Sequence, residues 1–217
     1  MLKRWKLIID NKHLSARENM QKDRELFESF EDGDTPVFRI YNWQKCFTYG
    51  VSQDIKRIDL SYGEDSAKRI TGGGILLHGH DISYSIIIDT KSLRGMNVKK
   101  SYEYFCEFIL EFYRSLGLKP VFAKDIEGIK LSKNIFCQVG FEPYDIIING
   151  KKIGGNAQKR GKNKLLQHGS IPVNHISHPF GGYSLEDIGV HLSEDKVIKE
   201  LKRSLEKTFH LSFSLIK

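Results

Sequence analysis

An Asn149-Gly150 pair stands between the apolar run Asp145-Ile146-Ile147-Ile148 and a pair of lysines. Asn-Gly between two strand-like segments is the strongest short-range signal for a β-hairpin, because both residue types accept a left-handed backbone. The stretch from Cys137 to His168 is therefore predicted to fold back on itself. Such a hairpin would hold Lys152 on a strand, with a cysteine a short distance upstream.

Elsewhere the chain alternates between strand-like and helix-like patterns. Helices are predicted from the N-cap Ser15, with Glu18 at the capping-box position, from Ser101 to Leu116, and from Ser193 to about Phe209. A short helix is expected over residues 51–58. Strands in neighbouring pairs, with helices that do not alternate regularly with them, indicate an α+β fold: a mostly antiparallel mixed sheet with packed helices. The predicted strands cover residues 5–10, 36–41, 46–49, 75–78, 82–89, 121–123 and 212–216.

A length of 217 residues with 40% hydrophobic residues fits a single domain that spans residues 1–217 and buries a full core. The N-terminus lacks the apolar segment of a signal peptide, and no apolar run is long enough to span a membrane. The three cysteines, Cys46, Cys106 and Cys137, show no CxxC spacing, so we expect reduced thiols in the cytoplasm. Cys46 and Cys106 lie in apolar patterns and are expected in the core.

The formal net charge is +7, which favours an acidic partner. Nucleic acid and an acidic carrier protein both satisfy this condition, and charge alone does not choose between them.

Three consecutive glycines, Gly72-Gly73-Gly74, follow Arg69 and precede an apolar strand. Glycines let backbone amides approach a ligand, and an arginine beside them can bind a carboxylate or a phosphate. The Gly-Lys-[ST] ending of a P-loop is absent, and no helix follows as in a dinucleotide fingerprint. A flexible turn explains the glycines equally well.

His78, His80 and Asp81 lie close together in the sequence. Their spacing fits no common zinc framework, so no metal site is predicted. A buried hydrogen-bonding role is the better interpretation for His78.

Cys137 and Lys152 form the most reactive pair that the sequence suggests. A free thiol has a pKa near ~8.5, and a nearby ammonium can lower it. A thiolate can accept an acyl group from a thioester, since one thioester replaces another. The alternative is a buried cysteine and a surface lysine without chemistry.

Three blocks, in this order, resemble the biotin/lipoate protein ligase catalytic superfamily, which includes lipoate-protein ligases and octanoyltransferases. The first is Trp5 with Ser15-Ala-Arg-Glu-Asn19-Met20 and Asp23. The second is the glycine stretch from Lys68 to His78. The third is the lysine hairpin from Gly150 to Gln158, followed by Leu165 to Ser170. Together they extend from about Trp5 to Val173.

Two features are more similar to the LipM-type octanoyltransferases than to the ligases. The His78-Gly-His80-Asp81 entry resembles the transferase version of this strand, and Cys137 occupies the place of the transferase acyl-accepting cysteine. Ligases of this superfamily normally need a C-terminal accessory domain, and the residues after Val173 are too few for one. Gln138 stands where the transferases usually have Phe, and the third glycine is typical of ligases. A ligase with a separate accessory chain therefore stays open.

The resemblance implies an octanoyltransferase of lipoate biosynthesis, which moves an octanoyl group from acyl carrier protein to a lysine of a lipoyl domain or a glycine cleavage H-like protein. Cys137 would form the acyl-enzyme, and Lys152 would hold the thiolate and stabilise the oxyanion with amides near Gly154 and Gly155. No cofactor is implied; ATP and Mg²⁺ enter only for a ligase. Residues expected to bind substrate are Arg69, Gly72, Gly73, Gly74, His78, Gly154, Gly155, Asn156, Ala157 and His168.

The same resemblance implies a cytoplasmic monomer that binds neither membrane nor nucleic acid, because the DNA-binding members carry a separate helix-turn-helix. A non-catalytic acyl-binding module on this fold is the alternative from another functional class.

Overall fold

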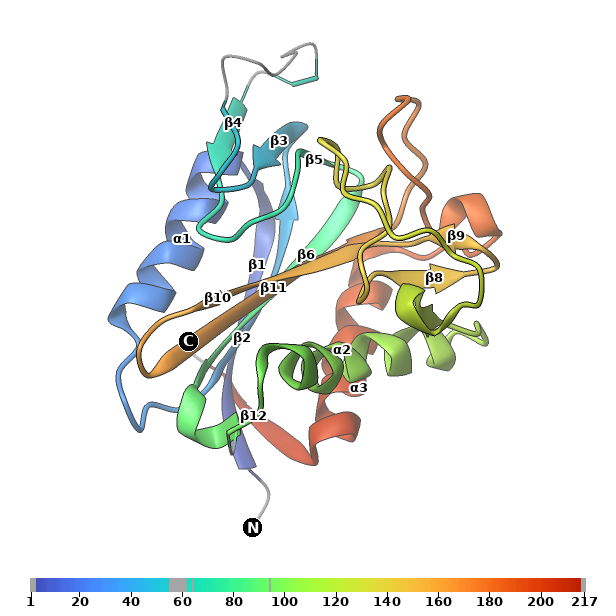
Figure 1. Cartoon of the computed structure of the whole chain (residues 1–217). Coiled ribbons are helices and arrows are strands. Elements are labelled where there is room, and N and C mark those ends of the chain that lie inside the picture. Colours follow the sequence, from blue (N-terminus) through green and yellow to red (C-terminus); the bar gives the residue numbers. More distant parts are fainter. Residues whose placement is uncertain (1–2, 55–61, 64, 94, 216–217) are drawn as a thin grey trace.

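A computed structural model describes residues 3–54, 62–63, 65–93 and 95–215. Its centre is a six-stranded sheet in the order β10-β11-β6-β2-β1-β12 (Figure 1). The pairs β10/β11, β11/β6 and β6/β2 are antiparallel, whereas β1 pairs in parallel with β2 and β12. The predicted α+β class with a mostly antiparallel mixed sheet is confirmed. The strands are β1 (Lys3–Leu14), β2 (Val37–Trp43), β6 (Asp81–Asp89), β10 (Gly155–Arg160), β11 (Lys164–Pro172) and β12 (Leu211–Leu215).

Three helices cover this sheet: α1 (Ala16–Ser29), α2 (Val98–Ser115) and α3 (Glu194–Phe209). The predicted capping box of α1 is present, because the Ser15 side chain accepts from the Glu18 amide while the Glu18 carboxylate binds the Ser15 amide. Helix α2 begins three residues before the predicted Ser101, since Asn97 caps it. Within the described residues, no helix is long and apolar enough to cross a membrane.

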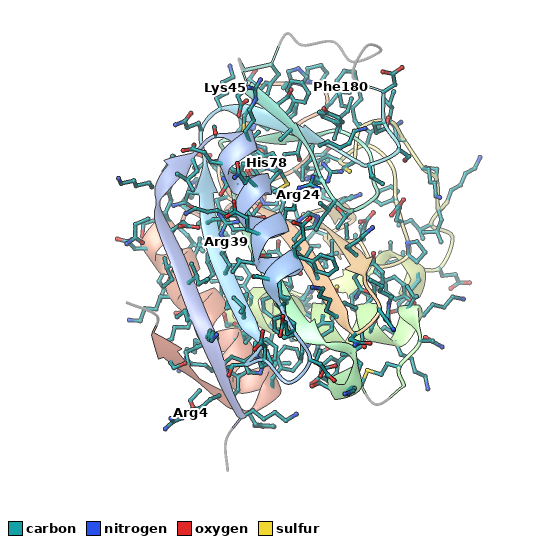
Figure 2. All side chains as sticks on the ribbon, turned by 90° about the vertical axis from the view of Figure 1, so that its left-hand side faces the viewer. Arg4, Arg24, Arg39, Lys45, His78 and Phe180 are labelled. Carbon is teal, nitrogen blue, oxygen red and sulfur yellow. The ribbon has the colours of Figure 1, made fainter. Side chains whose placement is uncertain are left out.

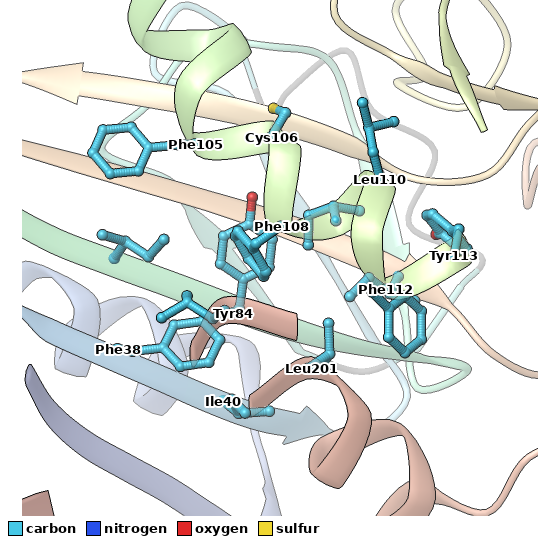
Figure 3. Packing of buried hydrophobic residues seen from close by; sticks show 14 of the residues in the cluster. Phe38, Ile40, Tyr84, Phe105, Cys106, Phe108, Leu110, Phe112, Tyr113 and Leu201 are labelled. Carbon is cyan, nitrogen blue, oxygen red and sulfur yellow. The ribbon is translucent and has the colours of Figure 1, made fainter. Parts of the chain in front are cut away.

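The two faces of the sheet differ in chemistry, because successive residues of a strand point to opposite sides. Phe38 and Ile40 of β2 and Tyr84 of β6 pack against Phe108 of α2 and Leu201 of α3, which gives an aromatic-rich core (Figure 3). The intervening residues face α1. They include apolar side chains near the C-terminal end of that helix and polar side chains closer to its N-terminal end. Figure 2 looks onto α1, with Arg39 labelled beside it.

Two small sheets lie at the ends of β2, β6 and β11. One has the order β4-β3-β5, made of β4 (Asp65–Lys68), β3 (Cys46–Tyr49) and β5 (Leu76–His78). The other has the order β7-β8-β9, made of β7 (Val121–Phe122), β8 (Ile146–Ile148) and β9 (Lys151–Lys152). The chain from 126 to 145, here called the Cys137 loop, forms no helix or strand in the described structure apart from one bridge between Phe136 and Ile75.

The predicted hairpin at Asn149-Gly150 is confirmed, with φ angles of 51° and 77° at the two turn residues. The stretch is more elaborate than one hairpin, however, because Gly154 ends the first and β10/β11 form a second in the six-stranded sheet. Strand β2 extends to Trp43, two residues beyond the predicted end of this strand at residue 41. The short helix expected over 51–58 lies mostly outside the described residues, and Val51 and Ser52 form a turn.

Candidate active site

A cavity of about 330 Å³ opens where the two small sheets meet the six-stranded sheet. Its walls come from the glycine loop (Arg69–Gly74), the Cys137 loop, the start of β10 and the middle of β11. All residues predicted to form the site line this cavity except Gly154. Gly154 instead has φ of 89° and packs against the carbonyl oxygen of Ser170. It lies where the chain passes from the β8/β9 hairpin to the β10/β11 hairpin.

Cys137 lies with its sulfur against the glycine loop. The Gly74 amide donates to Cys137 Sγ at 3.1 Å, and Arg69 Nη2 lies 3.8 Å from the same atom. The backbone amide of Cys137 donates to the Ile75 carbonyl at 2.8 Å, which fixes the residue beside β5. The sulfur therefore lies against two hydrogen-bond donors, one from the backbone and one from a guanidinium.

Lys152 is buried on β9 and does not contact that sulfur within the described structure. Its ammonium donates to the carbonyl oxygens of Cys137 at 2.6 Å and Gly140 at 3.0 Å, and lies 2.6 Å from Asp145 Oδ2. The expectation that Lys152 holds the thiolate is thereby corrected: an ammonium has three donors, and three oxygens occupy them. Burial raises the pKa of Asp145, although the charge of Lys152 opposes this shift.

The glycine loop needs its glycines for steric reasons. Gly73 has φ of 99°, and a Cβ there would lie 3.1 Å from Arg69 Nη2 and 3.4 Å from Cys137 Sγ. A Cβ at Gly74 would lie 2.3 Å from the Ile135 carbonyl oxygen. Arg69 Nη2 also donates to the Gly74 carbonyl at 2.5 Å. The loop therefore folds tightly around the arginine and against the cysteine.

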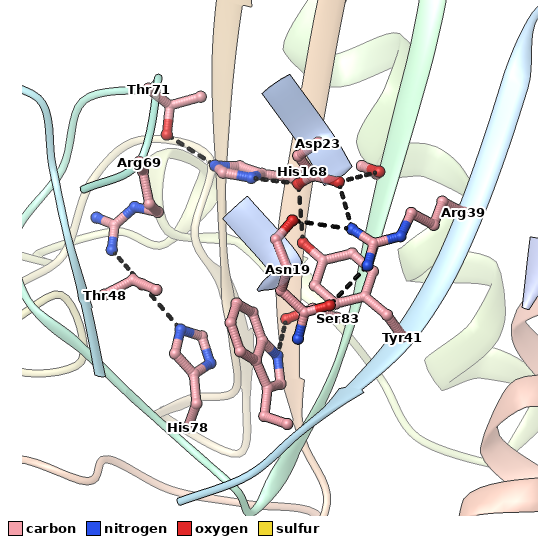
Figure 4. Close-up of polar contacts among 12 residues, drawn as sticks. Asn19, Asp23, Arg39, Tyr41, Thr48, Arg69, Thr71, His78, Ser83 and His168 are labelled. Atoms are coloured by element: carbon pink, nitrogen blue, oxygen red, sulfur yellow. Dashed lines mark hydrogen bonds and ion pairs between the residues drawn. The ribbon is translucent and has the colours of Figure 1, made fainter. Parts of the chain in front are cut away.

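His78 and His168 line the cavity, but protein groups occupy both nitrogens of each ring. His78 lies 2.9 Å from Asp81 Oδ2 and 2.8 Å from Thr48 Oγ1. His168 lies 3.4 Å from Asp23 Oδ2 and 2.7 Å from Thr71 Oγ1. Each ring therefore connects a buried carboxylate to a threonine; Figure 4 shows the contacts of His78 with Thr48 and of His168 with Thr71 and Asp23. The buried hydrogen-bonding role predicted for His78 is confirmed, and the expectation that both residues bind substrate stays a prediction. Burial lowers the pKa of His168, so its neutral form is favoured.

Behind His168, Arg39 forms the centre of a buried polar cluster between β2 and α1. Its guanidinium donates to Asp23 Oδ1 at 2.7 Å, to Asn19 Oδ1 at 2.6 Å and to Asp10 Oδ2 at 2.7 Å. Tyr41 donates to the other Asp23 oxygen at 3.0 Å (Figure 4). A fully buried charge is tolerated because each of these donors has an acceptor.

The start of β10 forms another wall. Gly155, Asn156 and Ala157 are half-buried there, and Tyr84 donates to Asn156 Oδ1 at 2.6 Å. On the neighbouring strand, Gly169 lies against both side chains. The Tyr84 hydroxyl and the neighbouring Gly169 therefore fix the position of the Asn156 side chain.

We predict that Gly169→Ala loses about 1–3 kcal/mol of unfolding free energy, the usual effect of overpacking. Its Cβ would lie 2.2 Å from Asn156 Oδ1 and 2.7 Å from Tyr84 Cε1, so the hydrogen bond between them must break. Urea denaturation followed by circular dichroism measures the change. Gly161→Ala is the matched control, since its Cβ would meet side-chain atoms of Lys164 and Phe27 at the longer distances of 3.2 and 3.3 Å. Equal losses in the two variants would contradict this account.

Several residues that support the site were missed by sequence reasoning. Thr48, Thr71 and Asp145 act through hydrogen bonds to Arg69, His168 and Lys152. Asp145 could have been suspected as a carboxylate at the start of a buried apolar run. The two threonines carry no local signal, because their partners are distant in the sequence.

A glycine loop, a cysteine beside it and a buried lysine on a hairpin thus meet at one cavity of a mixed α+β fold. The chain belongs to the lipoyl protein ligase A/B catalytic domain family, which it matches over residues 15–209. The resemblance seen in the motifs is thus confirmed at the level of the family.

Similar curated proteins are octanoyltransferases LipM. That of Clostridioides difficile (strain 630) is 32% identical over 182 residues, which cover 78% of this chain and 66% of the relative. That of Bacillus subtilis (strain 168) is 32% identical over 180 residues, which cover 77% of this chain and 64% of the relative. The chain thus spans slightly less than two thirds of the length of these relatives.

Similar solved structures are ligases. A lipoate-protein ligase A bound with ATP has a TM-score of 0.79 and 22% identity, with 99% of this chain and 90% of that chain covered. A bi-partite lipoate protein ligase from Thermoplasma acidophilum, described with its E2 lipoyl domain, has a TM-score of 0.76 and 22% identity, with 99% and 88% covered. The predicted catalytic-domain fold is confirmed by this likeness.

Proposed function

We propose that the chain is an octanoyltransferase of lipoate biosynthesis, which moves an octanoyl group from acyl carrier protein to a lysine of a lipoyl domain or a glycine cleavage H-like protein. The observation that carries this proposal is the position of Cys137 Sγ at the cavity wall, 3.1 Å from the Gly74 amide nitrogen and 3.8 Å from Arg69 Nη2. The octanoyltransferase relatives support the choice of acyl group.

The reaction would run in two balanced steps. The Cys137 thiolate attacks the carbonyl carbon of the carrier thioester; a new carbon–sulfur bond forms, and the carrier thiolate leaves. The neutral amine of the acceptor lysine then attacks the acyl-cysteine, an amide forms, the amine proton passes to solvent and the Cys137 thiolate is released. No ATP, metal or other cofactor is required, because the thioester is already activated.

Each group of the site has a role in this scheme. The Gly74 amide and the Arg69 guanidinium would stabilise negative charge that the sulfur carries during the reaction. Lys152 donates to the Cys137 carbonyl, so it would fix the position of the nucleophile and not stabilise its charge. The apolar wall that includes Met20, Trp43 and Leu76 would receive the acyl chain, where each buried CH₂ is worth about 0.8 kcal/mol.

Carrier protein and acceptor domain would both approach the mouth of one cavity. A net charge of +7 suits acidic partners. We place this activity in the cytoplasm and assign it to a monomer that binds neither nucleic acid nor membrane.

The decisive experiment is intact-protein mass spectrometry after incubation with octanoyl carrier protein. We expect one octanoyl adduct that disappears in Cys137→Ser and persists in Cys106→Ser, whose sulfur is fully buried in the core. An absent adduct, together with ATP-dependent lipoylation by Cys137→Ser, would establish a ligase instead. Acyl binding without turnover in any variant would establish a non-catalytic module.

A further inference from the structure

A continuous chain of hydrogen bonds runs from a buried carboxylate to the sulfur of Cys137. It starts at Asp81 on β6, passes through His78 and Thr48, and reaches the guanidinium of Arg69, whose Nη1 donates to Thr48 Oγ1 at 2.7 Å (Figure 4 shows the part from His78 to Arg69). Arg69 Nη2 then donates to the Gly74 carbonyl, and the Gly74 amide donates to Cys137 Sγ. Asp81, His78, Thr48 and Arg69 are all buried.

The hydrogens of this chain can be assigned by counting donors and acceptors. Arg69 can only donate, so Thr48 Oγ1 accepts from it and keeps one proton of its own. In the described part of the molecule, His78 Nε2 is the acceptor within reach of that proton, at 2.8 Å. The arrangement that satisfies each of these groups leaves His78 Nε2 without a hydrogen and places the ring proton on Nδ1.

The other end of the chain agrees with this assignment. Asp81 Oδ2 accepts from the hydroxyls of Ser170 at 2.6 Å and Ser83 at 3.2 Å, and lies 2.9 Å from His78 Nδ1. Burial by itself would raise the pKa of Asp81, but His78, His80 and the hydroxyl of Ser170 lower it, so the carboxylate is charged. A charged carboxylate accepts, and His78 Nδ1–H donates to it.

We propose that Asp81 is a positioning residue that holds His78 in its Nδ1–H form and thereby, through Thr48 and Arg69, keeps the Gly74 amide directed at the Cys137 sulfur. The location of the ring does not depend on Asp81 alone, because Trp43 stacks on the imidazole with centroids 3.8 Å apart. What Asp81 supplies is the choice of nitrogen that bears the proton. An asparagine there can instead donate to Nδ1, which moves the ring proton to Nε2.

That change would remove the acceptor of the Thr48 hydroxyl proton, because His78 Nε2 would itself become a donor. The Thr48 hydroxyl would then have to turn toward another acceptor, which would disturb its contact with Arg69 and, through Arg69, the glycine loop. Misplacement of a reacting group by about 1 Å can lower a rate by about 10²-fold. We therefore expect Asp81→Asn to lower kcat for acyl transfer by about this factor with a much smaller change in KM.

The kcat prediction rests on the proposed function. Two further measurements test the proposal without following turnover. Nitrogen-15 NMR of labelled histidine is expected to show His78 with Nδ1 protonated and Nε2 bare, and the reverse in Asp81→Asn, with His78→Gln assigning the signals. Iodoacetamide alkylation of Cys137 at pH 7 is expected to slow in Asp81→Asn. Asp89→Asn, another buried carboxylate on β6, is the matched control and should change neither.

A protonated Nε2 in the unaltered protein, or an unchanged alkylation rate in folded Asp81→Asn, would overturn the proposal. If Asp81→Asn does not fold, the alkylation rates of Thr48→Ser and Thr48→Val provide the test. Serine keeps the hydroxyl and should keep the alkylation rate, whereas valine should reduce it. Equal rates in these two variants would also overturn the assignment.

Discussion

Replacement of Asp23 by asparagine is expected to lower the free energy of unfolding by about 3–5 kcal/mol, the usual effect of removing one partner of a buried ion pair. Asp23 accepts from Arg39, Tyr41 and Ser85, and all of these side chains are buried. Asparagine carries no charge, so Arg39 would keep only Asp10 as a carboxylate partner. Urea denaturation followed by tryptophan fluorescence measures the loss.

A double-mutant cycle separates this ion pair from general packing. Arg39→Met removes the buried charge, so Asp23→Asn in that background should be much less destabilising than Asp23→Asn alone. Additive effects would show that the pair does not couple, contrary to this structure.

The effect of Asp23→Asn on the free energy of unfolding is expected to depend on pH. Burial raises the pKa of Asp23, but the hydrogen bond with His168 and the charge of Arg39 outweigh it, so the pKa lies below its ordinary value of 3.8. The carboxylate therefore stabilises the fold above about pH 4, and this stabilisation is lost as the pH falls through the lowered folded-state value. The difference between the unaltered protein and Asp23→Asn should shrink below pH 4.

Lys152→Met is expected to lower the rate of acyl-enzyme formation by about 10²-fold or more, the scale associated with a misplaced reacting group. Its ammonium ties the carbonyls of Cys137 and Gly140 to the β8/β9 hairpin. Methionine has similar length but no donors, so both carbonyls lose their partner and the Cys137 loop is released. Rapid-quench mass spectrometry of octanoyl-Cys137 measures the rate.

Asp145 allows stability to be separated from catalysis. In Lys152→Met, its buried carboxylate loses the ammonium that lies 2.6 Å away, which should destabilise the fold. Burial already raises the pKa of Asp145, and removal of the Lys152 charge would raise it further, so protonation of this carboxylate would relieve part of the loss. Adding Asp145→Asn should therefore restore stability but not the rate. Recovery of the rate in the double variant would contradict the positioning role of Lys152.

The local parts of this architecture could be predicted from sequence, because their causes are local. The α1 capping box, the Asn149-Gly150 turn and the apolar stripe of Val197, Leu201 and Leu205 depend on residues a few positions apart. The fold class followed from the order of such segments.

The contacts within the site were harder to predict. Sequence proximity suggested that Lys152 faces the Cys137 sulfur, but the Gly74 amide, 63 residues away along the chain, takes that place. His168 and Thr71 are 97 residues apart in sequence, and their contact depends on how two sheets meet. Residue types therefore indicated which side chains gather at the cavity, whereas hydrogen-bond partners required the three-dimensional arrangement.

The Cys137 loop leaves and returns to the same small sheet at adjacent points, since Phe122 of β7 and Ile146 of β8 are register partners. Insertions or deletions between these points need not shift the register of any strand, and doubling the length of such a loop costs only about 0.6 kcal/mol in closure entropy. The segment that carries Cys137, the proposed nucleophile, can therefore change in length and sequence independently of the scaffold that holds the lysine and the glycine loop. In evolutionary terms, changes confined to this one segment are sufficient to add a cysteine to the cavity wall or to remove it.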